Sequence, residues 1–158
     1  MNYKIRKRTK EDVHEFITWT YDGIYSFYDN NIQEEKINGF LQSIDNDQFY
    51  SVIDDQGQLI GNCEFFNVGE APEEILAVGV QMKPSLTGEG NGLTFIQAII
   101  DQGRELLGYD HLELAVAHFN KRAIKLYEKA GFKRKGDFQN NIRGENYNFI
   151  IMEKDWGE

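Results

Sequence analysis

The sequence predicts a mixed α/β fold, and three observations lead to that prediction. Short apolar runs bounded by turn residues alternate along the chain with longer segments whose apolar residues recur at helical spacing. One short run, residues 74–82, leads through a glycine-rich loop straight into a helical segment. Two strand-like segments at 132–138 and 147–154 flank residues 140–144 and are expected to pair antiparallel. Strands that alternate with helices in this way favour a mixed sheet with helices packed against it.

The other elements follow from the same periodicities and from signals at their ends. Thr9 is a good N-cap, and Gly108 is a natural C-cap. Asp55-Gln56-Gly57 has hairpin chemistry between two strand-like runs. In chain order we expect a strand at 3–8, helices at 10–19 and 33–44, strands at 48–54 and 58–67, the central strand at 74–82, a helix at 93–107, a strand at 109–116 and a helix at 119–130.

Length, composition and charge bound the class of protein. The 158 residues fit a single domain over residues 1–158, large enough to bury about 70% of its unfolded surface. No apolar run approaches the roughly 20 residues of a membrane helix, and no signal-peptide pattern is present, so we expect a cytoplasmic protein without a membrane partner. The single cysteine, Cys63, excludes an internal disulfide and a cysteine-cluster metal site, and no metal is expected. The formal net charge of -9 argues against a nucleic-acid partner. It would suit a cationic acceptor, although solubility alone explains it equally well.

The loop after the central strand has the composition of an anion site. Gly88, Gly90 and Gly92 remove the side chains that would keep a ligand away from the backbone, just ahead of a helix N-terminus. Backbone N–H groups and the helix dipole at such a place suit phosphate oxygens. The loop is not the dinucleotide fingerprint, because Leu93 stands where that pattern has its third glycine, and no P-loop sequence follows. From this loop alone, a phosphate site and a glycine turn without a ligand both remain open.

A second stretch of the sequence favours the phosphate site over a glycine turn without a ligand. Residues 116–132 contain Asn120, then an Ala-x-x-Leu-Tyr run ending at Tyr127, and then Gly131-Phe132. Together with the glycine loop, this stretch resembles the GNAT superfamily of acyl-CoA-dependent N-acetyltransferases. The resemblance implies the GNAT fold, a mixed central sheet of about six to seven strands flanked by about four helices, with strands splayed around acyl-CoA. One departure is plain, because Thr87 occupies the place where the family usually has arginine or glutamine.

The resemblance also implies the roles of individual residues. Asn120 would hydrogen-bond the pantetheine arm of acetyl-CoA, and Tyr127 would protonate the departing thiolate. Their helical spacing puts both on one face of the helix, where an N-cap role for Asn120 and a core role for Tyr127 are the alternatives. A backbone N–H on the central strand, at Val80, Gln81 or Met82, would polarise the thioester carbonyl. The pyrophosphate would be bound by the loop residues Gly88, Glu89, Gly90, Asn91, Gly92 and Leu93.

The acceptor amine also requires a base. An alkyl amine with a pKa of about 10.4 is neutral in only about one molecule in two thousand at pH 7. Some relatives carry a glutamate late on the fifth strand, but Ala115 occupies that position here. Glu74 at the start of the central strand is therefore our candidate, with Glu64 and Glu113 as alternatives. His111 and His118 are further candidates for a proton shuttle, and Lys121, Arg122 and Lys125 are candidates for another phosphate of the nucleotide, unless they form a solvated helix face.

The function predicted from these residues is transfer of the acetyl group of acetyl-CoA to a primary amine, by direct attack in a ternary complex. A small-molecule amine and a peptide amine both fit, and a homodimer is left open. The aromatic residues between 19 and 28 form either a loop packed on the core or, by the resemblance, a wall of the acceptor pocket. Two rival functions are a non-catalytic acyl-CoA-binding module and a nucleotide-binding enzyme that uses the glycine loop for ATP.

Overall fold

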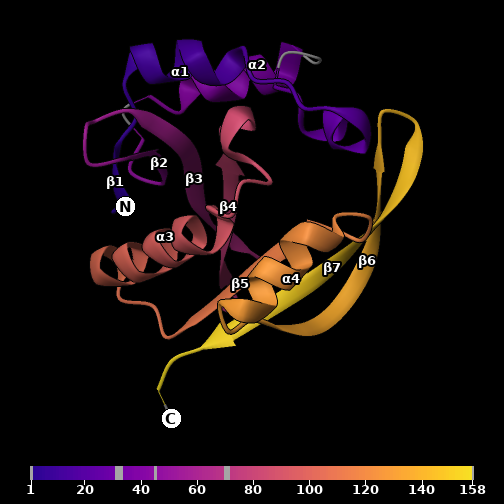
Figure 1. The fold of residues 1–158 in the computed structure, drawn as a ribbon. Coiled ribbons are helices and arrows are strands. Elements are labelled where there is room, and N and C mark those ends of the chain that lie inside the picture. The colour runs from indigo at the N-terminus through magenta and orange to yellow at the C-terminus, as the bar shows by residue number, and fades with distance from the viewer. Residues whose placement is uncertain (1, 31–33, 45, 70–71, 158) are drawn as a thin grey trace. The chain divides into compact units, whose positions relative to one another are not determined.

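In the computed structural model, the chain divides into two compact units (Figure 1). The residues described are 2–30, 34–44, 46–69 and 72–157. Unit 1 consists of Met1–Glu64 and Val80–Gln102, and unit 2 of Phe65–Gly79 and Gly103–Glu158. Three elements contribute residues to both units: β3 (Leu59–Val68), β4 (Ile75–Met82) and α3 (Gly92–Leu107). A single domain over residues 1–158 stays a prediction.

Unit 1 is built on antiparallel strands. β1 (Lys4–Lys7) pairs with β2 (Phe49–Ile53), and β2 pairs with β3. The predicted hairpin turn between β2 and β3 is present: Asp54 Oδ1 accepts hydrogen bonds from the backbone N–H groups of Gln56 and Gln58, each at 2.9 Å. Gly57 supplies the positive φ of 77° that this turn requires.

The helices of unit 1 bury their apolar faces together. α1 (Lys10–Ile17) starts at a capping box, in which Thr9 Oγ1 accepts from Asp12 N and Asp12 Oδ2 accepts from Thr9 N. α2 (Glu34–Gln42) lies beside α1 (Figure 1). The predicted start of the second helix, Gln33, lies outside the described residues. The core cluster contains Val13, Phe16 and Trp19, with Ile17, Tyr21, Phe40, Ile44 and Leu59 packed against it.

A buried arginine joins this cluster to the sheet. The Arg8 guanidinium donates to Ser43 Oγ at 3.0 Å, to the carbonyls of Tyr50 and Cys63 at 3.2 Å each, and to Asn62 Oδ1 at 3.4 Å. Burial lowers the pKa of Arg8 to about 10, so the side chain stays charged at neutral pH. Three rings lie 5.0–5.5 Å from its Cζ atom, those of Phe16, Phe40 and Phe49.

Unit 2 contains further strand pairings and the helix that precedes its last two strands. β4 pairs in parallel with β5 (His111–Ala117) through Ala77 and Glu113. β5 pairs antiparallel with β7 (Glu145–Asp155), which pairs antiparallel with β6 (Lys133–Ile142). α4 (Lys121–Lys129) precedes this hairpin and buries Ile124. Because β4 contributes to both units, the pairings run in the order β1-β2-β3-β4-β5-β7-β6, a seven-stranded mixed sheet that confirms the predicted fold class.

The structure departs from the sequence prediction at two connections. The segment between α1 and α2 contains a 3₁₀ helix, η1 (Gly23–Tyr28), where a loop was predicted. The terminal hairpin is longer than predicted, since β6 and β7 pair up to Ile142 and Glu145. A two-residue turn closes it, with φ of 54° at Arg143 and 82° at Gly144, a conformation that matches the right-handed twist of paired strands. Of the helices in the described ranges, none has the length and hydropathy needed to cross a bilayer.

Candidate functional site

The backbone N–H and C=O groups at the end of β4 point alternately towards β3 and away from it. Lys83 N donates to the carbonyl of Ile60 on β3 at 2.7 Å. Because backbone groups alternate along a strand, those of Gln81 face β3 as well, while those of Val80 and Met82 face the opposite edge. On that edge the Tyr21 hydroxyl donates to the carbonyl of Met82 at 2.6 Å. Of the three residues predicted to polarise the thioester, Val80 and Met82 therefore direct their backbone N–H groups away from β3, whereas Gln81 directs its own towards β3.

A network of three amide side chains connects this end of β4 to its neighbours. Gln81 Oε1 accepts from Asn30 Nδ2 at 2.9 Å and from Asn62 Nδ2 at 3.1 Å. Gln81 Nε2 donates to Asn30 Oδ1 at 2.9 Å and to the carbonyl of Tyr28 at 3.2 Å. Asn30 is fully buried and also donates to the carbonyl of Phe16 at 2.7 Å. The network fixes the end of η1 against β4, and sequence reasoning missed it.

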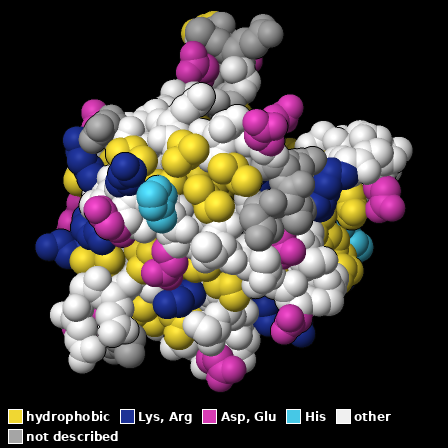
Figure 2. Space-filling model, turned by 90° about the horizontal axis from the view of Figure 1, so that it is seen from above, with side chains coloured by type: hydrophobic (Ala, Val, Ile, Leu, Met, Phe, Trp, Pro, Cys, Tyr) yellow, Lys and Arg dark blue, Asp and Glu magenta, His cyan; other side chains and the backbone are white. Residues whose placement is uncertain are grey.

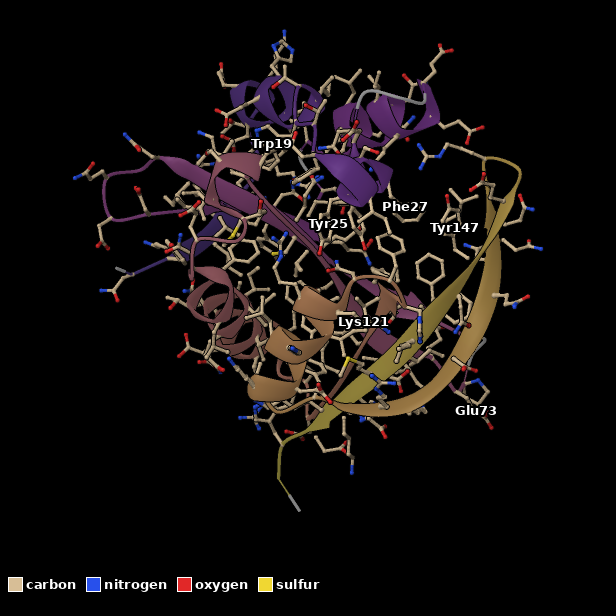
Figure 3. The ribbon with its side chains drawn as sticks, turned by 45° about the vertical axis from the view of Figure 1, so that its right-hand side comes forward. Trp19, Tyr25, Phe27, Glu73, Lys121 and Tyr147 are labelled. Carbon is tan, nitrogen blue, oxygen red and sulfur yellow. The ribbon has the colours of Figure 1, made fainter. Side chains whose placement is uncertain are left out.

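The aromatic residues of η1 lie on this connection. Trp19, Tyr25 and Phe27, labelled in Figure 3, belong to the segment that connects α1 to α2 in the sequence. Trp19 packs edge-on against Phe16 in the core, with 5.0 Å between ring centroids, and Phe27 lies edge-on to Tyr28 at 5.1 Å. Trp19 therefore has the core role, while an acceptor-pocket role for the η1 aromatics stays a prediction.

The glycine loop lies at the N-terminus of α3. After the short 3₁₀ helix η2 (Pro84–Leu86), Gly88 and Gly90 are exposed and adopt φ of 75° and 84°. A Cβ added at Gly90 would meet no atom within 4 Å, so its surroundings are open. α3 then begins at Gly92, with Phe95 N donating to the carbonyl of Asn91 at 3.1 Å. Two glycines in this conformation turn the backbone ahead of a sixteen-residue helix, an arrangement that fits phosphate oxygens.

Three other residues of this loop are placed as follows. Thr87, which departs from the family pattern, uses its hydroxyl locally, donating to the carbonyl of Pro84 at 2.8 Å. Its side chain therefore closes the turn of η2. Glu89 and Leu93 are exposed. The roles predicted for them stay predictions.

The predicted catalytic helix, α4, lies in unit 2. Asn120 is its N-cap, with Oδ1 accepting from Ala123 N at 3.2 Å. Tyr127 is half-buried and lies edge-on to Phe132, with 6.1 Å between the ring centroids. The alternative roles named for both residues are thus present, and neither excludes contact with a ligand. The basic residues Lys121, labelled in Figure 3, Arg122 and Lys125 are exposed on this helix.

The three candidate bases have different surroundings. Glu74 is exposed and precedes β4. Glu64 is half-buried on β3, and burial raises its pKa against the opposing effect of Arg8. Glu113 is buried on β5, where burial would raise its pKa, but hydrogen bonds from Lys135 at 2.5 Å and His111 at 2.9 Å outweigh that effect and lower it. Glu113 is therefore held as an anion and is a poor proton acceptor.

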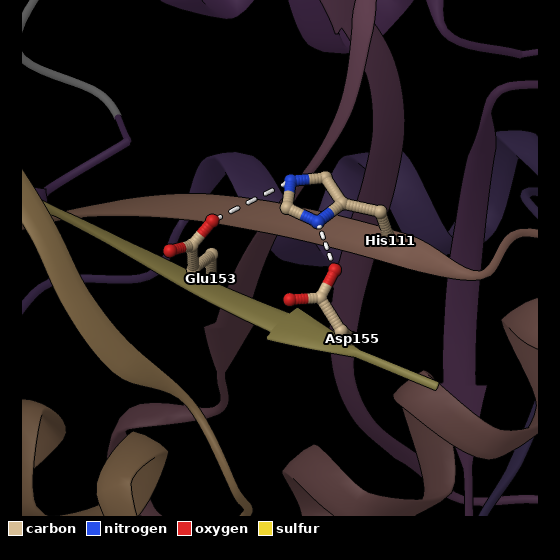
Figure 4. A group of neighbouring side chains, drawn as sticks. All are labelled: His111, Glu153 and Asp155. Atoms are coloured by element: carbon tan, nitrogen blue, oxygen red, sulfur yellow. Dashed lines mark hydrogen bonds and ion pairs between the residues drawn. The ribbon is translucent and has the colours of Figure 1, made fainter. Parts of the chain in front are cut away.

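His111 completes an ion-pair cluster around Glu113. Its Nδ1 lies 2.6 Å from Asp155 Oδ1, and Figure 4 shows the ring between Asp155 and Glu153. These hydrogen bonds to Glu113 and Asp155 raise the pKa of His111. Donor atoms of His111, Glu153 and Asp155 lie within 4.8 Å of one another, but both ring nitrogens are already bonded to carboxylates. A protonated His111 and Lys135 balance much of the negative charge of this cluster.

The chain matches a known protein family and is similar to solved structures. A family model described as an acetyltransferase (GNAT) domain matches residues 3–133. The chain is similar in structure to a chimera of spermidine N-acetyltransferase SpeG from Vibrio cholerae and hSSAT, with 20% identity, a TM-score of 0.79, and coverage of 98% of this chain and 96% of that chain. It is also similar to an acetyltransferase (GNAT family) from Bacillus anthracis, with 19% identity, a TM-score of 0.76, and coverage of 98% and 95%. At these identities the likeness shows the fold.

Proposed function

The chain belongs to the GNAT acetyltransferase domain family, and from this premise we propose that it transfers the acetyl group of acetyl-CoA to a primary amine. The observation that carries the proposal is the open glycine loop at the N-terminus of α3. Gly88 and Gly90 are exposed with positive φ, and nothing lies within 4 Å of a Cβ built at Gly90. Oxygens of a pyrophosphate can therefore approach the backbone closely at Gly90, and the N–H groups from Gly88 to Leu93 would be their donors.

Residues of this chain supply three further actions in the proposed reaction. Acetyl-CoA brings an acetyl thioester, an activated carbonyl that an amine can attack directly in a ternary complex. The backbone N–H of Val80 or Met82, on the edge of β4 away from β3, would donate to the carbonyl oxygen as negative charge develops there. Asn120 would hold the pantetheine amides. Tyr127 would give its hydroxyl proton to the sulfur as the carbon–sulfur bond breaks.

The acid role of Tyr127 requires a dry environment around the sulfur. A phenol with a pKa of about 10 is a weaker acid than a thiol of about 8.5, so transfer to a solvated thiolate would be unfavourable. Desolvation makes a thiolate more basic and reverses that order. Tyr127 is half-buried against Phe132, which is consistent with a partly dry position.

The acceptor in this proposal is a small-molecule or peptide amine. The similar structure from Vibrio cholerae is named as a spermidine N-acetyltransferase, which makes a polyamine the first compound to test. The net charge of -9 would favour a cationic acceptor. A cytoplasmic location, the absence of nucleic-acid and membrane partners, and the open question of a homodimer stay predictions.

The test measures thiol release from acetyl-CoA with a panel of amines that includes spermidine, an amino sugar and an amino acid. We expect turnover with at least one amine, and a loss of about 10²-fold or more in kcat for Tyr127→Phe. Tyr3→Phe makes the same chemical change just before β1 and should leave kcat unchanged.

Binding is measured separately by the thermal shift with coenzyme A and with ATP. At a ligand concentration of 100 Kd, coenzyme A should stabilise the fold by about 2.7 kcal/mol. Coenzyme A binding without turnover on any amine would support the non-catalytic module instead. Stabilisation by ATP but not by coenzyme A would overturn both readings in favour of a nucleotide-binding enzyme.

A further inference from the structure

Glu64 is a half-buried carboxylate that the fold leaves without a partner. Within the described ranges it forms neither a hydrogen bond nor an ion pair. Its position opposite Phe49 in the β2–β3 register places an aromatic neighbour on the same face of the sheet. Its oxygens are not cut off from solvent, so this unpaired carboxylate is available to a ligand that arrives from solution.

The register of β3 places Glu64 beside the predicted reaction site. The bonds from Lys83 to Ile60 and from Asn62 to Gln81 show that β3 and β4 run antiparallel. Glu64 shares a face with Asn62 and lies about 7 Å further along β3, because side chains alternate and each residue advances about 3.3 Å. Two residues along β3 from Asn62 correspond to two residues back along β4 from Gln81, so Glu64 lies opposite Gly79, next to Val80. The carboxylate thus lies on the face of the amide network, near the β4 edge that would hold the thioester.

Arg8 is the charged residue that opposes the rise in the pKa of Glu64, but its N–H groups already donate hydrogen bonds to other groups. Its guanidinium hydrogens are directed at Ser43, Asn62 and two backbone carbonyls. Cys63, the adjacent residue, is neutral, because burial raises the pKa of its thiol to about 12. The charge of Arg8 therefore stabilises the ionised form of Glu64, although the two side chains form no ion pair in the described ranges. The site is suited to a cation that arrives from solution.

We propose that Glu64 binds the ammonium group of the acceptor and serves as the general base that deprotonates it. The inference rests on the proposed acetyl transfer and adds to it a residue that contacts the acceptor. The ammonium gives one proton to a Glu64 oxygen, which later passes it to solvent. The nitrogen lone pair then forms the carbon–nitrogen bond to the acetyl carbon while the carbon–sulfur bond breaks. The sulfur takes a proton from Tyr127, and Tyr127 is restored through solvent by the second proton that the nitrogen loses.

Proton affinity favours Glu64 over the other two carboxylates. An ordinary glutamate with a pKa of about 4.3 is a weak base towards an ammonium of about 10.4. Burial raises the pKa of Glu64 and so narrows that gap, with Arg8 opposing. Glu113 has a lowered pKa and is bonded to Lys135 and His111, so it cannot receive an ammonium without losing those partners. Glu74 is exposed, where water competes for an ammonium.

The first test compares the pH dependence of kcat/KM in Glu64→Gln, Glu64→Asp and wild type, with the best amine of the panel. Wild type should lose activity on acidification as a carboxylate takes up a proton. Glu64→Gln should lose about 10²-fold in kcat/KM at neutral pH and lack that acidic limb, while Glu64→Asp should retain the limb with a smaller loss. Glu105→Gln, an exposed helix position with the same charge change, should behave as wild type. An intact acidic limb and near-normal kcat/KM in Glu64→Gln would overturn the proposal, and a matching loss in Glu74→Gln alone would move the base to Glu74.

The second test does not depend on turnover. The carboxyl carbon of Glu64 is followed by NMR in the cofactor-free protein, with the resonance identified from its absence in Glu64→Gln. Spermidine should shift this resonance and lower the apparent pKa of Glu64, because an ammonium favours the anion. A resonance that spermidine leaves unchanged would overturn the proposed contact. If wild type acetylates no amine, the transferase proposal fails, and this titration still decides whether Glu64 binds a cationic amine.

Discussion

The amide of Gln81 is expected to be the strongest polar link between η1 and β4, and Gln81→Met tests this. Methionine keeps the length of the side chain but removes all four hydrogen bonds of the amide. Two groups then lose a partner: Asn30 Oδ1, in a fully buried residue, and Asn62 Nδ2, in a residue 6% exposed. The carbonyl of Tyr28 keeps a hydrogen bond from Lys36 at 3.1 Å.

The size of the effect follows from these two orphaned groups. Each buried polar group left without a partner costs about 1–3 kcal/mol, so the free energy of unfolding should fall by about 2–6 kcal/mol. For a domain of this size, Tm should fall by roughly 5–20 °C. Urea unfolding followed by circular dichroism measures the free energy, and a differential scanning experiment measures Tm.

The matched control is Gln97→Met on α3. Gln97 makes one amide hydrogen bond, to Asp101 at 3.0 Å on the exposed face of the helix, so its replacement should cost less than about 0.5 kcal/mol. The reasoning is refuted if Gln81→Met is as stable as Gln97→Met, because the buried amides of Asn30 and Asn62 would then have found other partners.

Three further predictions concern stability. Gly61→Ala should cost about 2–4 kcal/mol in urea unfolding, because the added Cβ would overlap the backbone carbonyl oxygen of Gln81 and lie 2.7 Å from the ring of Phe95. Adding Phe95→Leu should not restore stability, because the overlap with the Gln81 carbonyl remains, and full restoration would contradict this explanation. Asp12→Asn should lower the free energy of unfolding by about 2–3 kcal/mol at pH 7. Burial raises the pKa of Asp12, but hydrogen bonds, led by that from Arg6, outweigh burial and lower it. The stability difference between Asp12→Asn and wild type should therefore be complete above about pH 4 and shrink as pH falls through the lowered pKa of Asp12. His111→Gln should lower Tm by about 1–3 °C at pH 6. Because the pKa of His111 is raised in the folded protein, this difference in Tm should vanish as pH rises through that raised pKa. A difference in Tm that persists to pH 9 would contradict the ion-pair explanation.

Local sequence signals predicted most of the fold because they act over a few residues. Thr9 and Asp12 are three residues apart and form the start of α1 almost independently of the rest of the chain. The Asp54 to Gln58 turn likewise forms through hydrogen bonds between neighbours. The terminal hairpin was predicted too short because Asn140 and Asn141 favour turns in isolation, while pairing with the partner strand keeps them extended.

The amide network could not be predicted, because its members are distant in sequence. Asn30 and Gln81 are 51 residues apart, and Asn62 and Gln81 are 19 apart. One signal was available, namely that Asn62 lies within an otherwise apolar strand, where a polar side chain needs a buried partner. The identity of that partner depends on strand order and register, which a single sequence does not specify.

The base was also hard to choose from sequence, for a related reason. Glu74, Glu64 and Glu113 all lie in or beside strands, so their chemical identity does not separate them. Their surroundings do: water around Glu74, two cations on Glu113, and a half-buried face without a partner at Glu64. Burial and pairing come from residues elsewhere in the chain, and they decide which carboxylate can accept a proton.

In the proposed reaction, the end of β4 would serve the fold and a ligand together. Side chains leave a strand perpendicular to the sheet, whereas backbone N–H groups lie within it, so the two sets of contacts do not compete. The Gln81 side chain holds η1 against one face of the sheet, and the Tyr21 hydroxyl donates a hydrogen bond to the carbonyl of Met82. Burial raises the pKa of Tyr21, so that hydroxyl remains a donor at any physiological pH. The carbonyl oxygen of Met82 is thereby satisfied within the protein, and the N–H groups on the same edge keep their direction towards the place where a thioester would bind.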